Sequence, residues 1–187
     1  MEELIRLDHE LFLFLNNLGT PAWDGFWLAI SNKFTGIPLY IFFIYLLYRH
    51  FGWKNTVVSV VVIVLLITST DQLANLFKDG FQRLRPCRQE GIMEQARFVA
   101  VRCGHYGYFS AHASNSTGVA LFLILVFRNI YKKWIYLILL WPLLASYSRI
   151  YLGVHYPADV VTGILIGAIL GYMFYQFHLF LRKKFRV

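Results

Sequence analysis

Three short strings of this chain combine the residue types that phosphoryl-transfer chemistry needs: cations, a hydroxyl, two histidines and a carboxylate. They lie far apart in the sequence, at residues 78–86, 109–112 and 148–159. Each string borders a long apolar run, so folding of those runs would bring the strings to one surface. Cations and hydroxyls bind phosphoryl oxygens, and a histidine held by a carboxylate keeps one ring nitrogen free as a nucleophile. The strings therefore predict a phosphate-handling site.

The third string is the most specific of the three. Ser148 and Arg149 close one apolar run, and the residues from His155 to Asp159 open the next. Pro157 suits the first position of a helix, where its missing N–H costs nothing. Asp159 would then lie in the first turn, fold back toward His155 and fix its tautomer. A simple Asp–His capping pair is the alternative interpretation.

The second string places Ser110 and His112 where an apolar run begins. Serine is a favoured helix N-cap, so capping alone would explain Ser110. The alternative is an anion site formed by the exposed N–H groups of the helix start, among them that of Ala111, with the Ser110 hydroxyl added. His112, in the first turn, would point at the same anion.

The first string sets Lys78 and Arg85 seven residues apart, about two helical turns if the helix continues that far, with Pro86 stopping it. A lysine after an apolar run is often a membrane anchor. Together with Arg85, it is interpreted here as a phosphate ligand.

The candidate residues divide into two roles. His155 would attack phosphorus and form a phosphohistidine, and His112 would protonate the departing oxygen before water releases phosphate. No carboxylate cluster for Mg²⁺ and no three-histidine zinc pattern is visible in the sequence, so we expect chemistry without a metal or other cofactor. The residues expected to hold the phosphate are Lys78, Arg85, Ser110, Ala111 and Arg149.

The elements that must position these residues are predicted to be membrane helices. The chain has 187 residues, is 58% hydrophobic, and several of its apolar runs approach the roughly 20 residues that cross a bilayer. We expect an all-α integral membrane bundle of five to six transmembrane helices. Five spans are predicted near 36–50, 56–77, 111–128, 134–150 and 158–182, with a break at residues 50–54 after the first.

Two segments lie outside these spans. Residues 1–33 form an N-terminal interfacial region, in which residues 4–18 are typical of an amphipathic helix lying in the interface or, equally, of a helix packed on the bundle. Residues 79–108 form the extramembrane loop between the second and third spans. In the last span, Gly163, Gly167 and Gly171 recur every four residues and predict close approach of another helix.

Charge placement predicts the orientation. The net charge is +8, but if residues 57–77 run toward the strings, the opposite face receives nine cations and no acidic residue. Short loops rich in Lys and Arg stay in the cytoplasm, so the strings are expected on the outer side. These nine cations are Arg49, Lys54, Arg128, Lys132, Lys133, Arg182, Lys183, Lys184 and Arg186.

The two cysteines, Cys87 and Cys103, both fall in the predicted loop. On the outer side a disulfide between them is expected, and free thiols or a weak metal pair are the alternatives. Four arginines in or near the loop, at positions 83, 88, 97 and 102, would either contact a second phosphate or meet anionic head groups.

The three strings resemble the signature of the type 2 phosphatidic acid phosphatase family, KxxxxxxRP, PSGH and SRxxxxxHxxxD. The first and third strings match in full. In the middle string Phe109 stands for the proline and Ala111 for the glycine, while Ser110 and His112 are kept. Because Ala111 still offers its N–H group, we expect phosphate binding to survive.

The resemblance covers about residues 56–175, the predicted catalytic core of a single membrane phosphatase domain at 1–187. It implies a multi-pass protein of the bacterial inner membrane with its site on the periplasmic side. The implied substrate is a membrane lipid phosphate, with no metal, no nucleic acid and no obligate protein partner. It also implies the phosphohistidine at His155 and the phosphate-binding roles already assigned.

The expected function is hydrolysis of a lipid phosphate or pyrophosphate end. Undecaprenyl pyrophosphate is the first choice, and phosphatidylglycerol phosphate, phosphatidic acid and lipid A are the alternatives. Transfer of the phosphoryl group to an acceptor hydroxyl is a second class of function. An anionic-lipid binder or transporter without turnover is the third.

Overall fold

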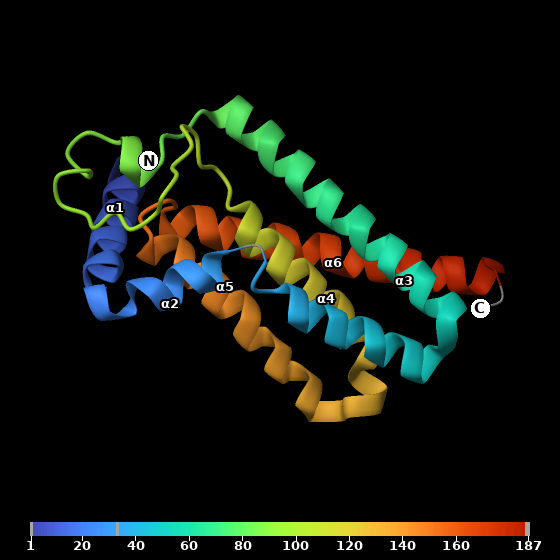
Figure 1. Cartoon of the computed structure of the whole chain (residues 1–187). Helices are drawn as coiled ribbons and strands as arrows, with labels where there is room; N and C mark the ends of the chain where they lie inside the picture. The colour runs from blue at the N-terminus through green and yellow to red at the C-terminus, as the bar shows by residue number, and fades with distance from the viewer. Residues whose placement is uncertain (1, 33, 186–187) are drawn as a thin grey trace.

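The computed structural model describes residues 2–32 and 34–185, and over these residues the regular elements are all helices, with one isolated β-bridge. Figure 1 shows the long helices running side by side, with the shorter N-terminal helices and the loop gathered at one end of the bundle. In chain order the elements are α1 (Glu2–Asn17), α2 (Pro21–Ser31), α3 (Ile37–Phe81), the 3-10 turn η1 (Pro86–Arg88), α4 (Ala111–Tyr131), the 3-10 segment η2 (Lys132–Leu139), α5 (Leu140–Tyr151) and α6 (Pro157–Phe185). The predicted all-α class is confirmed.

Helix α3 is two helices joined by a sharp turn. Gly52 lies inside it with φ 73° and ψ 172°, values that only glycine adopts readily. In Figure 1 the chain runs to the far end of the bundle and then returns toward the loop. The break predicted at residues 50–54 is confirmed, and we call residues 37–51 and 53–81 the first and second halves of α3.

The segment predicted as a continuous span at 134–150 is not one α-helix. It is the 3-10 segment η2 followed by α5. Pro142 lies in the first turn of α5 and has no N–H to donate to the preceding turn, so a regular α-helix cannot run through this point. The predicted span is therefore helical throughout, with a change from 3-10 to α-helix just before Pro142.

Helices α4 and α6 pack backbone to backbone. A Cβ atom built on Gly163 would lie 2.5 Å from the carbonyl oxygen of Ser110, and one on Gly171 would lie 2.6 Å from that of Gly118. A Cβ on Gly167 would overlap the backbone of Ser114. The predicted close approach of a second helix is therefore confirmed, and α4 is the helix concerned.

The N-terminal helix α1 is held on the bundle by one buried amide. Asn16 donates to the carbonyl oxygens of Arg97, Ile150 and Tyr151 at 2.9–3.0 Å, and its own Oδ1 accepts from the Arg97 N–H at 2.7 Å. Phe12 is also buried, while Leu4 and Phe14 on the outer face are exposed. Helix α1 is thus a packed helix with an apolar outer face, which combines the two interpretations.

The outer surface of the long helices is apolar. By length and composition alone, α3 and α6 are able to cross a membrane. Exposed leucine, isoleucine, valine and aromatic side chains cover both helices, for example Ile41, Val61, Leu165 and Ile169. A continuous apolar exterior of this kind indicates a lipid-facing surface.

Candidate active site

The third string places a histidine and a carboxylate together at the start of α6. His155 lies in the short α5–α6 connection, and its Nδ1 is 3.5 Å from Oδ2 of Asp159 in the first helical turn. Asp159 is fully buried and also accepts the Tyr156 N–H at 3.0 Å, as an N3 carboxylate does in a helix cap. The predicted fold-back and the alternative capping role are therefore both present.

The surroundings keep the His155 ring neutral. Burial, followed by the charges of Arg85, Arg149 and Lys78, lowers the pKa of His155 well below its usual 6.5. A neutral imidazole is the form that can attack an electrophile. The three cations that lower this pKa are those predicted to hold the phosphate.

Arg85 reaches the site from an extended segment and not from a helix. Gln82, in the left-handed region at φ 48°, ends α3, and the chain beyond pairs with residues 105–107 through the Leu84–Tyr106 bridge. The Arg85 Nε donates to the Tyr106 carbonyl oxygen at 2.9 Å. The helix therefore does not continue from Lys78 to Arg85, although the charges of both residues lower the pKa of His155.

Gly107 is a site position that the sequence did not reveal. A Cβ atom there would lie 2.8 Å from Cγ of Arg85 and 3.6 Å from Nδ1 of His155. Its backbone also contacts the His155 ring. Glycine is required because the backbone passes directly between the cation and the histidine.

The predicted phosphate ligands have no carboxylate at ion-pair distance among the described residues. Within residues 2–32 and 34–185, none of Lys78, Arg85 and Arg149 forms an ion pair. Arg149 donates to the hydroxyl of Ser31, and its buried Nε has no hydrogen-bond partner. A cluster of cations with unused donors beside a neutral histidine has the charge and the donors that can bind an anion.

The second string opens α4. Ser110 is fully buried and its hydroxyl accepts the Ala113 N–H at 3.5 Å, so the capping interpretation holds, and the hydroxyl proton is still free to be donated. Ala111 is the first helical residue, and His112 is exposed on the wall of a cavity of about 390 Å³. Phe109, which stands for the family's proline, is buried against Phe77 of α3, with ring centroids 5.3 Å apart.

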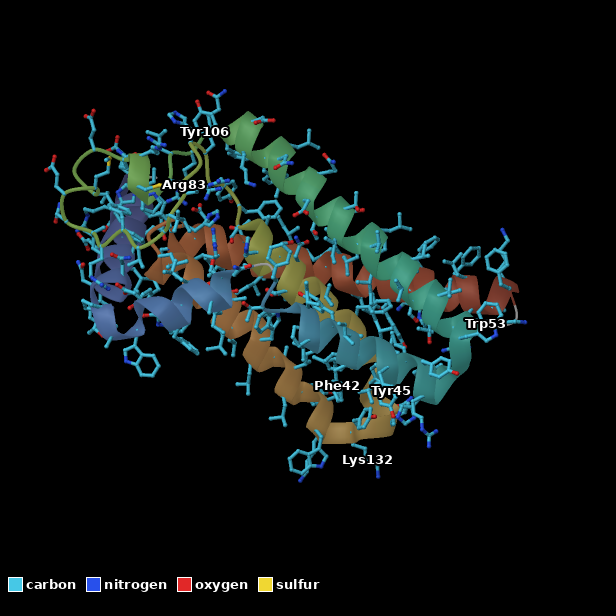
Figure 2. All side chains as sticks on the ribbon, viewed as in Figure 1. Phe42, Tyr45, Trp53, Arg83, Tyr106 and Lys132 are labelled. Carbon is cyan, nitrogen blue, oxygen red and sulfur yellow. A yellow bond between two sulfur atoms is a disulfide. The ribbon has the colours of Figure 1, made fainter. Side chains whose placement is uncertain are left out.

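Asp159 is bonded by Arg83, which is in turn bonded by Asp8, and both residues lie outside the predicted set. The Arg83 guanidinium donates to Oδ1 of Asp159 at 2.6 Å and to Oδ2 of Asp8 in α1 at 2.5 Å, and it lies over the Tyr156 ring. The other Asp8 oxygen accepts the Ala158 N–H at 2.9 Å. Burial alone would lower the pKa of Arg83, but Asp159 and Asp8 outweigh it and raise that pKa. Figure 2 shows Arg83 at the loop end of the molecule, where α1 and the start of α6 meet.

These contacts revise the suggested role of the loop arginines. Arg83 is engaged by two carboxylates and Arg97 pairs with Asp24 at 3.1 Å, so the charges of both guanidinium groups are already paired within the protein. Cys87 and Cys103 are joined by the predicted disulfide, with their Cα atoms 6.6 Å apart.

The structure thus unites at one end of the bundle the residues of three separate strings, and it adds Gly107, Arg83 and Asp8. A family model described as the PAP2 superfamily matches residues 56–183. The chain belongs to the PAP2 superfamily. The resemblance to type 2 phosphatidic acid phosphatases, and the expectation of a membrane lipid phosphatase, are confirmed.

Individual relatives agree with this assignment. The chain is similar to the lipid A 4'-phosphatase of Bacteroides thetaiotaomicron, with 40% identity over 94% of this chain and 78% of the relative. It is similar to the protein of the same name from Porphyromonas gingivalis, with 34% identity over 98% of this chain and 78% of the relative. The fold resembles a crystal structure of a transmembrane PAP2 type phosphatidylglycerolphosphate phosphatase from Bacillus subtilis, with a TM-score of 0.75 and 17% identity over 95% of this chain and 87% of that one.

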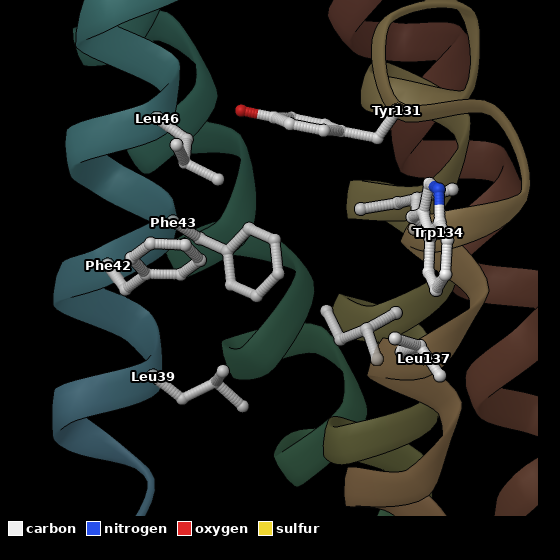
Figure 3. Close-up of a pocket in the computed structure, with 9 residues that line it drawn as sticks. Leu39, Phe42, Phe43, Leu46, Tyr131, Trp134 and Leu137 are labelled. Atoms are coloured by element: carbon white, nitrogen blue, oxygen red, sulfur yellow. The ribbon is translucent and has the colours of Figure 1, made fainter.

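A second cavity lies away from these residues. Figure 3 shows Leu39, Phe42, Phe43 and Leu46 of α3 facing Tyr131, Trp134 and Leu137 across an apolar groove of about 310 Å³. None of the residues that line it is a cation, a carboxylate or a histidine. Apart from the hydroxyl of Tyr131 and the indole of Trp134, the residues that line the groove are aliphatic or phenylalanine.

Proposed function

We propose that this enzyme removes a phosphate monoester from a lipid A-type phosphoglycolipid through a phosphohistidine on His155, without a metal. The observation that carries the chemistry is the neutral, buried His155 surrounded by Lys78, Arg85 and Arg149, none of which has a carboxylate partner in the described chain. A phosphoryl group supplies the negative charge that this cluster lacks.

In the proposed reaction the cations hold the phosphoryl oxygens and offset the charge that develops on them. Asp159 orients the His155 ring, whose other nitrogen attacks phosphorus and displaces the lipid oxygen. His112 gives its proton to that oxygen and then takes one from the water that hydrolyses the phosphohistidine. Each proton and bond is accounted for by residues of this chain.

The choice of lipid rests on the relatives. The two most similar relatives described above carry the name lipid A 4'-phosphatase and match nearly the whole chain. This favours a phosphorylated glycolipid over undecaprenyl pyrophosphate, the first expectation from sequence, which becomes the alternative. With an apolar exterior on the bundle, the substrate's acyl chains would lie in the bilayer beside the helices.

We further propose a topology with five crossings. They are the two halves of α3, then α4, η2 with α5, and α6. Helices α1 and α2 lie at the site end, which faces the periplasm of the inner membrane because the opposite end carries the acid-free cations. Reporter fusions after Trp53 and after Glu90 should show the cytoplasmic and the periplasmic side, respectively.

The test is phosphate release by the purified protein in detergent with excess EDTA. Lipid A, undecaprenyl pyrophosphate, phosphatidylglycerol phosphate and phosphatidic acid would be offered separately. We expect the fastest release from lipid A, none from His155→Ala, and normal release from His50→Ala, a matched histidine at the other end of the bundle. Rapid acid-free quenching should trap the phosphate on His155. The mechanism would be refuted if EDTA abolished phosphate release. It would also be refuted if no phosphate were found bound to the quenched wild-type protein.

A further inference from the structure

The cavity beside His112 contains a carboxylate and several other polar groups although it lies among membrane helices. It has a volume of about 390 Å³, within the range of roughly 300–1,000 Å³ typical of small-molecule sites. Residues from α2, the α2–α3 connection, both halves of α3, α4 and α5 line it. The side chains that matter below are Asn32, Asp71, His112, Asn115 and Trp141.

Asp71 is the least expected member of this cavity. The exposed Asp71 side chain lines the cavity from the second half of α3, and it forms no ion pair with any residue in the described ranges. Its Oδ1 accepts from Nδ2 of Asn115 at 2.8 Å, and Thr70 donates to Asn115 Oδ1, so the amide is fixed and the second Asp71 oxygen is unused. An ionisable residue within a membrane helix is costly, which marks it as functional.

His112 connects this cavity to the chemistry. In the proposed mechanism His112 donates a proton to the departing oxygen, so the leaving group must lie on the side of His112 that is open. That side is the polar cavity, since His112 forms part of its wall. The cavity therefore receives the part of the substrate that remains after phosphate is removed.

The lining of the cavity indicates what that part is. A carboxylate repels a leaving group that carries its own phosphate, as a lipid pyrophosphate does, but accepts hydrogen bonds from hydroxyl and amide groups. Asn32 adds an amide, and the Trp141 ring adds an apolar wall. Neutral groups with many hydroxyls and an apolar face are sugars.

The cavity also borders an apolar one. Tyr40 and Ile67 line both this cavity and a groove of about 190 Å³ between the halves of α3 and α4. A chamber with polar groups beside an apolar groove matches a sugar head group joined to an acyl chain.

We propose that the Asp71–Asn115 cavity is a leaving-group site that selects a neutral sugar head group and disfavours a lipid whose leaving group is phosphorylated. This rests on the proposed phosphatase activity of His155 and His112. Asp71 is a specificity-determining residue, and it takes no part in attack on phosphorus.

The test compares Asp71→Asn with wild type on three substrates: a phosphorylated glucosamine lipid, undecaprenyl pyrophosphate and para-nitrophenyl phosphate. The substitution removes the charge at nearly constant volume. We expect kcat/KM for the sugar lipid to fall about tenfold, as for a lost hydrogen bond to a charged acceptor. We expect the value for the pyrophosphate to rise about threefold as repulsion is removed, and para-nitrophenyl phosphate to change less than about twofold. Glu90→Gln, which neutralises an exposed loop carboxylate, should match wild type on all three.

The outcomes separate this inference from the proposed function. Equal loss on all three substrates would mean that Asp71 supports the fold or the chemistry, and an unchanged ratio of sugar lipid to pyrophosphate would remove its role in selection. Either result overturns the inference while leaving the phosphatase intact. A wild type that hydrolyses only the pyrophosphate would overturn the proposed substrate itself.

Discussion

Replacing Arg83 by methionine tests how the histidine–carboxylate pair is held. The substitution keeps an unbranched stem and removes both contacts of the guanidinium, at 2.6 Å to Asp159 and 2.5 Å to Asp8. The Asp159 side chain is fully buried and that of Asp8 is 10% exposed, so two carboxylates lose their shared counter-charge inside the protein. Removing one partner of a buried pair costs about 3–5 kcal/mol, and the 23% exposure of Arg83 points to the lower end.

The effect on turnover follows from the bond to Asp159. A hydrogen bond to a charged group contributes about 1.5–3 kcal/mol, and if that ordering of Asp159 and His155 is lost in the transition state, kcat falls about tenfold to hundredfold. The KM should change little, because Arg83 is bound to carboxylates and not to phosphate. Initial rates over a range of substrate concentrations, with thermal unfolding in detergent, measure both quantities.

Two further variants sharpen this test. Asp8→Asn weakens the second anchor of Arg83 and should reproduce part of the loss in kcat. Arg6→Met is the matched control. Arg6 and Glu10 form an exposed ion pair on α1, the helix that carries Asp8, and this pair contributes at most about 0.5 kcal/mol to stability. A raised KM with unchanged kcat in Arg83→Met would refute the reasoning and return Arg83 to phosphate binding.

Three other results are expected. Because burial and the neighbouring cations lower the pKa of His155 below 6.5, activity should persist below that pH and disappear only as His155 becomes protonated; a rate that already falls between about pH 7 and about pH 6.5 would contradict this reasoning. Reduction of the Cys87–Cys103 disulfide should lower stability by about 3 kcal/mol, seen as a lower Tm with dithiothreitol, and a Cys87→Ser variant should not respond to the reductant. Phe109→Ala should cost about 3–5 kcal/mol, since the ring is fully buried; a Tm equal to that of wild type would show that its contact with Phe77 is unimportant.

The parts of the site that sequence predicted depend on local spacing. His155 and Asp159 are four residues apart at a helix start, and Pro157 marks that start, so their contact follows from helix geometry alone. The glycines at 163, 167 and 171 share one helix face for the same reason, and the break at Gly52 follows from its position between two apolar runs.

The parts that sequence did not predict depend on contacts between distant segments. Arg85 is positioned by pairing with Tyr106, and Arg83 by Asp8, which lies 75 residues away. No local pattern indicates that Asp8, one of several charged residues in α1, faces the site. The change from 3-10 to α-helix within the span at 134–150 was likewise not predicted, because the apolar composition of the run does not distinguish the two helix types.

The joined starts of α4 and α6 limit how the enzyme can move. The Ser110 N–H donates to the Asp159 carbonyl oxygen at 3.0 Å, and Gly163 lets the backbone of α6 pass directly beside Ser110. His112 and His155, at the start of α4 and just before α6, are thereby carried on one stiff unit, and their spacing cannot relax to admit a bulky lipid. We therefore expect that loading and clearing of the site leave the spacing of this histidine pair unchanged.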